Sequence, residues 1–208
     1  MKIGGMALAA LVFLAQPAFA AYTVLIYENG GNVVAEGSGS VNTSALTLLG
    51  PTSDYSYIYN SLGHACIGTG TMGSPVPTTW YMGGTALAAF GPSSAPQHIA
   101  DTGSGSQVCI AGIGGQLGLP SGYTSGESLG NSTAVWQGAT LSSLQLTPGT
   151  YQSSWGQDDT ADSFTLVIRA PAPPAVPAVT AVPTLSEWGL ILLAAMAGAL
   201  GLRARRRS

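Results

Sequence analysis

The sequence predicts an all-β protein, with an antiparallel β-sandwich-like ectodomain and a single short C-terminal transmembrane helix. Glycine is frequent, at 29 of 208 residues, while Lys and Glu are scarce, and this composition disfavours helices in the main body. Short runs of β-branched and aromatic residues recur between turn-forming residues, as in an all-β domain. Near the C-terminus, an uncharged apolar run is followed by arginines, a pattern typical of a membrane segment.

The predicted strands lie in the ectodomain, residues 21–169. In the last run every second residue, starting at Phe164, is large and apolar, as expected for a strand with one buried face. The sequence Asn-Gly-Gly-Asn at 29–32 predicts a hairpin turn. Residues 68–105 are expected to form mainly long loops. The runs that predict strands are 22–27, 33–36, 44–49, 55–59, 108–113, 133–137, 150–155 and 163–168.

The N-terminal residues 1–20 have the composition of a secretory signal peptide. Lys2 supplies a positive charge, residues 3–14 form an apolar core, and Ala18-Phe19-Ala20 is a small-residue cleavage site. The apolar core spans only about 18 Å as a helix, too short to cross a membrane. We therefore expect export through Sec-type machinery and a mature protein that begins at Ala21.

The charge of the ectodomain excludes one class of partner. The whole chain has a net charge of −3, but four arginines lie beyond residue 202. Residues 21–182 contain one basic residue, Arg169, and eight acidic residues, a net charge of −7. Nucleic-acid binding requires clustered basic side chains that contact phosphates, so we expect none here.

The two cysteines, Cys66 and Cys109, are expected to form a disulfide, because an even number of cysteines in an exported protein favours pairing. A bridge closing this loop would contribute about 4 kcal/mol on the chain-entropy model. Two buried free thiols are one alternative. A catalytic Cys66 assisted by His64 is another, but no orienting third group is evident.

Three other patterns resemble chemical sites. Residues 68–73 match G-x-G-x-x-G but lack the following helix and acidic residue of a dinucleotide site, and so predict a turn. Residues 126–130 match G-x-S-x-G but lack the flanking strand and helix of a nucleophile elbow, and both histidines lie upstream. Asp158, Asp159 and Asp162 form either a solvated turn or a calcium site. We assign no catalytic residue, cofactor or metal ligand, and expect no enzyme activity.

The C-terminal region has four parts after the ectodomain. Residues 170–181 are rich in Pro and Ala and predict an extended, semi-rigid linker. The polar motif VPTLSEWG occupies 182–189. Residues 189–202 predict a transmembrane helix of about 21 Å, which is short against a hydrocarbon core of roughly 30 Å. The basic end, residues 203–208, places the C-terminus in the cytoplasm. Its orienting residues are Arg203, Arg205, Arg206 and Arg207.

Residues 182–208 resemble the IPTLxxWG-CTERM sorting signal, a relative of the PEP-CTERM signals of Gram-negative bacteria. Pro183, Thr184, Leu185, Trp188 and Gly189 match its motif, Val182 replaces the usual Ile, and Ser186 and Glu187 fill the variable pair. The resemblance implies an exosortase, a membrane-embedded transpeptidase, as the partner that cleaves the tail. It also implies a transient anchor in the inner membrane before release to the cell surface or the extracellular space.

The expected function is that of a non-enzymatic surface or extracellular-matrix protein. The alternative is a module that binds surface polysaccharide or another polymer, with Trp80, Tyr81, Trp136 and Trp155 as stacking surfaces. Core packing explains these aromatic residues equally well. Two or more of them lining one open groove would favour binding, and burial of all four would favour a scaffold. A secreted hydrolase is the third hypothesis, and the sequence lacks a base–nucleophile set for it.

Overall fold

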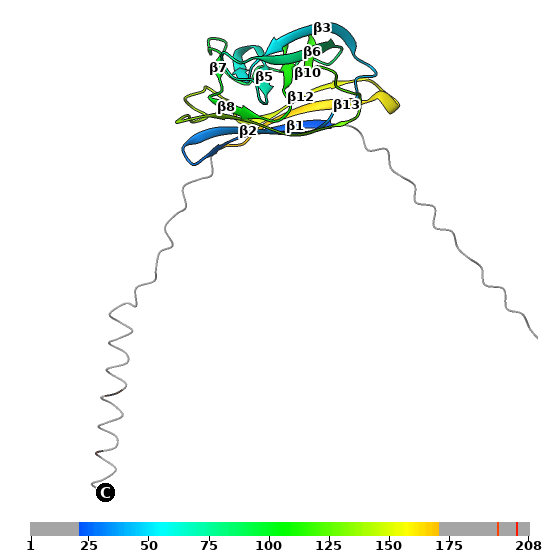
Figure 1. The fold of residues 1–208 in the computed structure, drawn as a ribbon. Helices are drawn as coiled ribbons and strands as arrows, with labels where there is room; N and C mark the ends of the chain where they lie inside the picture. Colours follow the sequence, from blue (N-terminus) through cyan, green and yellow to red (C-terminus); the bar gives the residue numbers. More distant parts are fainter. Residues whose placement is uncertain (1–20, 171–194, 196–202, 204–208) are drawn as a thin grey trace, which may run out of the picture. The chain divides into compact units, whose positions relative to one another are not determined.

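Two β-sheets packed face to face make up the ectodomain in the computed structural model (Figure 1). The structure describes residues 21–170, Ala195 and Arg203. By its contacts the chain divides into two units, Met1–Pro171 and Ala172–Ser208. The described residues of the first unit confirm an all-β fold, with only short 3₁₀ helices between the strands.

The first sheet has six strands in the order β12-β13-β1-β2-β11-β8. Strand β1 pairs in parallel with β13, and the other neighbouring strands are antiparallel. The parallel pair departs from a purely antiparallel prediction. It joins segments more than a hundred residues apart, and no local sequence pattern reports such a pairing. The strands are β1 (Ala21–Asn29), β2 (Asn32–Ser40), β8 (Thr102–Ser104), β11 (Ser128–Trp136), β12 (Gly149–Trp155) and β13 (Asp162–Ile168).

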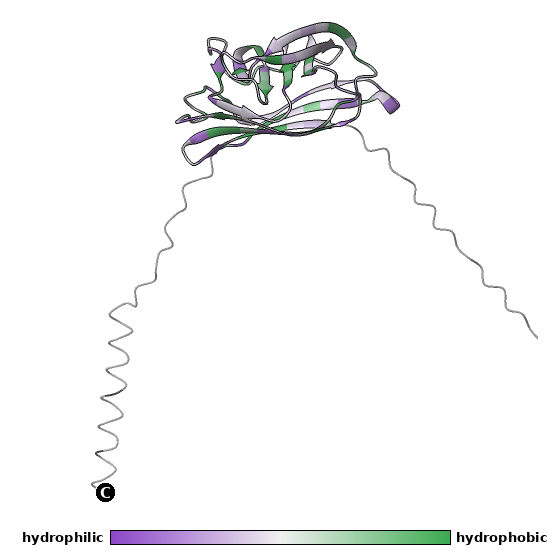
Figure 2. Ribbon diagram, viewed as in Figure 1, coloured by the Kyte–Doolittle hydropathy of each residue, from purple (hydrophilic) through white to green (hydrophobic). Residues whose placement is uncertain are grey.

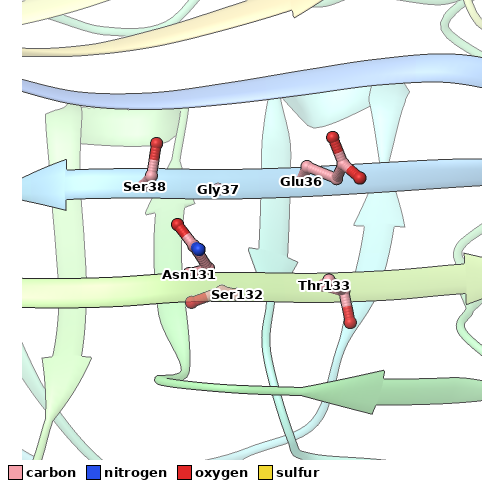
Figure 3. Close-up of a pocket in the computed structure, with 6 residues that line it drawn as sticks. All are labelled: Glu36, Gly37, Ser38, Asn131, Ser132 and Thr133. Atoms are coloured by element: carbon pink, nitrogen blue, oxygen red, sulfur yellow. The ribbon is translucent and has the colours of Figure 1, made fainter.

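The second sheet has seven strands, all antiparallel, in the order β3-β6-β10-β9-β5-β4-β7. Its strands cross behind those of the first sheet rather than running alongside them (Figure 3). The strands are β3 (Thr47–Asp54), β4 (Tyr57–Tyr59), β5 (His64–Ile67), β6 (Val76–Met82), β7 (His98–Ile99), β9 (Val108–Ala111) and β10 (Gln116–Pro120). The 3₁₀ helices are η1 (Asn60–Leu62), η2 (Ile113–Gly115) and η3 (Asp158–Thr160).

The core lies between the two sheets and is formed by alternate residues of their strands (Figure 2). Phe164, Leu166 and Ile168 of β13 are buried while the residues between them are partly exposed, which confirms the predicted alternation. Large side chains with almost no exposed surface fill this space. They include Tyr22, Val24 and Ile26 from the first sheet and Ile67, Ile110, Leu117 and Leu119 from the second.

The predicted hairpin between the first two strands is confirmed. Asn29 pairs with Asn32, and the two glycines between them have φ values of 58° and 81°. Both φ values lie in the left-handed region, which explains why glycine occupies both central positions of this two-residue turn.

The prediction of long loops over residues 68–105 is wrong for three segments. Strand β6 lies within it, and the short strands β7 and β8 lie there as well. Strand β6 was not predicted because it contains Pro77, a residue that rarely occurs inside strands, yet Pro77 pairs with Ser53 of the edge strand β3. Strands β5 and β10 were also not predicted, because β5 is short and β10 contains Gly118 and Pro120.

The signal peptide, the linker, the motif at 182–189 and most of the predicted transmembrane helix lie outside the described residues. Ala195 and Arg203 are the described residues of that region, and both are helical and exposed. Within the described part of the chain, no helix combines the length and the apolar character that crossing a membrane requires.

Candidate functional site

The two cysteines form the predicted disulfide, which links adjacent strands of the second sheet. Cys66 of β5 and Cys109 of β9 are directly opposite each other, with 4.0 Å between their Cα atoms, and both are fully buried. The bridge excludes a catalytic Cys66 thiol in this structure. The His64 ring instead packs edge-on against Tyr59, with 6.3 Å between ring centroids, and burial lowers the pKa of His64.

The four aromatic residues proposed as stacking surfaces do not gather in one groove. Trp136 and Trp155 are buried, and their indole N–H groups donate to the backbone oxygens of His98 and Asn42. Tyr81 packs against the core from the inner face of β6. Trp80, the next residue along the strand, therefore lies on the outer face.

Trp80 is held in place on that outer face. Its indole Nε1–H donates to Asp54 Oδ2 over 2.8 Å. A Cβ atom added at Gly118, its partner on β10, would come within 3.0 Å of Trp80 Cε2 and 2.9 Å of Cys109 Cβ. The indole therefore lies against the glycine, and a larger residue at 118 would displace it.

A row of paired residues crosses the outer face of the second sheet from Trp80 to a tyrosine. The register runs from Trp80 through Gly118, Cys109 and Cys66 to Tyr57 on β4. Four strand spacings separate the ends of the row, about 19 Å. Burial, with smaller contributions from the charges of Asp54 and Tyr55, raises the pKa of Tyr57 to about 12. The outer face of the second sheet thus has half-buried aromatic rings at both ends of the row, while Gly118, Cys109 and Cys66 between them are buried.

Tyr57 and Tyr59 were missed as site candidates because the run YSYIY was interpreted only as a strand. Tyr57 and Tyr59 flank the buried Ile58, so alternation places both on the outer face. Sandwich strands usually present polar residues outward, so tyrosine at both outward positions of β4 was a usable indication of a surface site.

The aspartates at 158–162 do not form a cluster of equivalent ligands. Asp158 and Asp159 lie in η3, which is exposed, whereas Asp162 is buried. The Asp162 carboxylate accepts two backbone hydrogen bonds: from Asn42 N to Oδ2 over 2.5 Å, and from Ser163 N to Oδ1 over 2.6 Å. Burial raises the pKa of Asp162, and these two hydrogen bonds oppose that shift. Among the described residues, no group of three or more His, Cys, Asp or Glu could hold a metal ion.

The outer face of the first sheet has a shallow depression of about 320 Å³ between β2 and β11 (Figure 3). Glu36 is the ionisable residue of its lining, and a hydrogen bond to Glu36 raises the pKa of the neighbouring Tyr27. Such a surface can donate and accept hydrogen bonds but supplies no paired nucleophile and base. The lining residues are Glu36, Gly37, Ser38, Asn131, Ser132 and Thr133.

The glycine-containing motifs adopt the local structures expected for turns and strands. Within residues 68–73, Thr71 pairs with Ser74 in an isolated antiparallel bridge, which confirms a turn. Ser128 opens strand β11 instead of sitting between a strand and a helix, so it does not form a nucleophile elbow. Both histidines lie on the second sheet, on β5 and β7.

A family model for the IPTL-CTERM motif matches residues 180–207. This range contains the predicted motif at 182–189, the apolar run and the arginines that follow it. Neither the search of curated proteins nor the search of solved structures finds a match to the chain. The chain carries a C-terminal sorting signal of exported proteins, and the motif implies a substrate of a processing enzyme.

Proposed function

We propose that this protein is displayed at the cell surface or in the extracellular matrix, after an exosortase cleaves its C-terminal sorting signal. The observation that carries the proposal is the match of residues 180–207 to the IPTL-CTERM motif. The ectodomain acts through its surface and performs no catalysis of its own. Before processing, the apolar helix holds the chain in the inner membrane.

The layout of the chain supports this order of events. The last strand ends at Ile168, and the Arg169 N–H donates to Ile26 O at the edge of the folded unit. The residues between the fold and the motif are rich in proline, a composition that favours an extended segment. A peptidase at the membrane surface can then reach the motif while the ectodomain stays folded.

The cleavage step is tested by measuring the intact mass of the protein from wild-type cells and from cells lacking the exosortase. We expect wild-type cells to yield a chain without residues 190–208, and the deletion strain to retain them in its membranes. Pro183→Ala and Trp188→Ala should reduce cleavage, because they alter the motif. Val176→Ala, in the linker, is the matched control and should be processed normally. Mature protein that keeps its arginines in both strains would refute the proposal.

A second function is binding of an uncharged polymer, such as a surface polysaccharide, to the outer face of the second sheet. The observation that favours it is the row between Trp80 and Tyr57, with half-buried aromatic rings at its ends. Aromatic rings can pack against the apolar faces of sugar rings. The sequence between Asp54 and Asp101 contains no charged residue, which suits a neutral ligand.

Binding is tested by affinity electrophoresis of the full chain in gels that contain dextran or hydroxyethylcellulose. If this face binds, wild-type protein is retarded and Trp80→Ala and Tyr57→Ala lose the retardation. Tyr27→Ala removes a half-buried aromatic residue from the other sheet and should behave as wild type. Equal mobility of all variants with and without polymer would rule out this face for both probes.

A further inference from the structure

The exposed large apolar side chains of the ectodomain gather along one side of the second sheet. Among the described residues, the exposed large apolar residues include Met72, in the turn after β5, and the group that we call the apolar rim. The apolar rim consists of Leu48, Leu49, Leu62, Met82 and Ile113. Leu48 and Ile113 are 62% and 63% exposed, so these side chains contribute little to the core.

The sheet register places the apolar rim at one end of neighbouring strands. Thr47, the first residue of β3, pairs with Met82 at the end of β6, and Met82 pairs with Gln116 at the start of β10. Ile113 begins η2, immediately before β10. Leu62, the last residue of η1, lies beside the start of η2. A Cβ atom added at Gly112, just before η2, would lie within 3 Å of Leu62 O, so η1 and η2 are in contact.

From β3 to β5 the rim crosses four strand spacings, a length of about 19 Å. The loop after β6 extends it, because Ala86, Ala88 and Ala89 are exposed. This loop lies against the rim. A Cβ atom added at Gly63 would lie 3.1 Å from Ala88 O. The exposed apolar side chains therefore follow one end of the sheet as a strip, and are not scattered over the whole surface. Met82 lies on the outer-face side of this end, and Leu48, paired with Tyr81, lies on the inner-face side.

The strip also lacks charge. The segments that form it, residues 44–50, 60–63, 81–92 and 111–117, contain no Asp, Glu, Lys or Arg. All the charges of the ectodomain lie elsewhere in the chain, and they sum to −7. Two copies that approach through surfaces that carry these charges therefore bring like charges together, which opposes association. Through the strip they meet without that repulsion.

Strand β3 adds backbone groups to the same surface. It is an edge strand of the second sheet, so the N–H and C=O groups on its outer side have no strand partner among the described residues. Charged side chains usually protect such an edge, but residues 44–53 carry none. Pro51 interrupts the edge near its middle, so the unprotected part is the half that carries Leu48 and Leu49.

We infer that the apolar rim is a self-association surface, on which a second copy of this chain docks. The contact is isologous: each copy contributes the same residues, and the symmetry closes the dimer. The unpaired edge of β3 supports a second copy as the partner, because in an isologous contact this edge lies beside the same edge of the other copy. This inference goes beyond the proposed sorting and does not depend on cleavage of the tail.

The test is the mass of the purified full chain in mild detergent, measured by sedimentation velocity. We expect the wild type to be a dimer, and Leu48→Lys/Ile113→Lys to be a monomer at a concentration where the wild type is fully paired. The added lysines are solvent-exposed, so the variant should keep the wild-type near-UV circular dichroism. Met82→Glu is a second variant with the same expected loss.

Met72→Lys is the matched control, because Met72 is 74% exposed but lies in a turn away from the strip. It should remain a dimer. Because all variants keep the C-terminal helix, association through that helix would leave every variant dimeric and would overturn the inference. A monomeric wild type, or equal loss of the dimer in Met72→Lys, would overturn it as well.

Discussion

Replacing Asp162 with alanine should destabilise the ectodomain, because it removes the carboxylate that holds the loop after β2 in place. The Asp162 carboxylate accepts backbone N–H groups from Asn42 and Ser163, and the replacement leaves both without this partner. An unpaired buried N–H costs about 1–3 kcal/mol. Both groups are only partly buried, and removing the carboxylate also removes its desolvation penalty. We therefore expect a total loss of about 2 kcal/mol, at the low end of the sum.

The assay is thermal unfolding followed by circular dichroism, with and without calcium. A loss of about 2 kcal/mol lowers Tm by about 4–8 °C for a domain of this size. Asp159→Ala is the control. It removes a carboxylate from the same acidic segment, but Asp159 is exposed and contributes its backbone oxygen to Asn42, which the variant keeps. Its Tm should stay within about 2 °C of the wild type.

The two hypotheses for this segment give different outcomes. If the aspartates bound calcium, Asp159→Ala and Asp162→Ala would lose similar stability, and EDTA would lower the Tm of the wild type alone. If Asp162 acts as an internal anchor, only its replacement matters and calcium has no effect. Equal, calcium-dependent losses would refute the anchoring argument.

Three further outcomes are expected. Cys66→Ala/Cys109→Ala should lose about 4 kcal/mol in urea unfolding, because the bridge closes a 43-residue separation, and reductant should not destabilise this variant further. Burial raises the pKa of Tyr22 to about 12 from 10.0. The native state thus retains that proton to higher pH than the unfolded chain does, so stability falls as pH rises. In urea unfolding, the loss between pH 10 and 12 should be about 2 kcal/mol larger in the wild type than in Tyr22→Phe, because other buried tyrosines such as Tyr57 contribute to the loss in both proteins. Gly118→Ala should cost about 1–3 kcal/mol and shift the fluorescence of Trp80, because the new methyl group meets the indole ring.

The sequence allowed more of the first sheet than of the second to be predicted. Apart from β8, the strands of the first sheet are seven to nine residues long, and β13 alternates apolar and polar residues because one face is buried and the other is in water. Strands of the second sheet are shorter and carry residues that local rules assign to turns. Gly118 shows why. It has no side chain because Trp80, from another strand, occupies the space, and this reason exists only in the folded structure.

The candidate sites divide along the same line. The sorting motif is a local pattern in an extended segment, so residue order alone identifies it. The aromatic row and the apolar rim depend on register between strands that are distant in sequence. Thr47 and Met82 are neighbours only because β3 pairs with β6. The absence of charge on the strip is the one feature of these surfaces that residue order does indicate. A chain without charged residues from 55 to 100 must have a large uncharged surface somewhere.

The position of the chain exit bears on how a surface protein would use these faces. Strand β13 is parallel to β1, so Ala21 pairs with Ser163 at one end of the first sheet and Ile26 pairs with Ile168 at the other. The chain leaves the sandwich at the second end. Loops cover the first end, and Asn42 connects them. Its backbone N–H donates to the Asp162 carboxylate, and its backbone oxygen accepts a hydrogen bond from the Trp155 indole. The loop beside the apolar rim bonds near both ends of the edge strand β12. The Thr85 N–H donates to Ser154 O, level with the first end, and the Thr147 N–H donates to Phe90 O just before β12 begins, at the second end. This loop therefore runs along the flank of the sandwich. A contact along this flank would be made by the second sheet and its loops, whereas the chain leaves the ectodomain from β13 of the first sheet, so association and the chain exit use different strands.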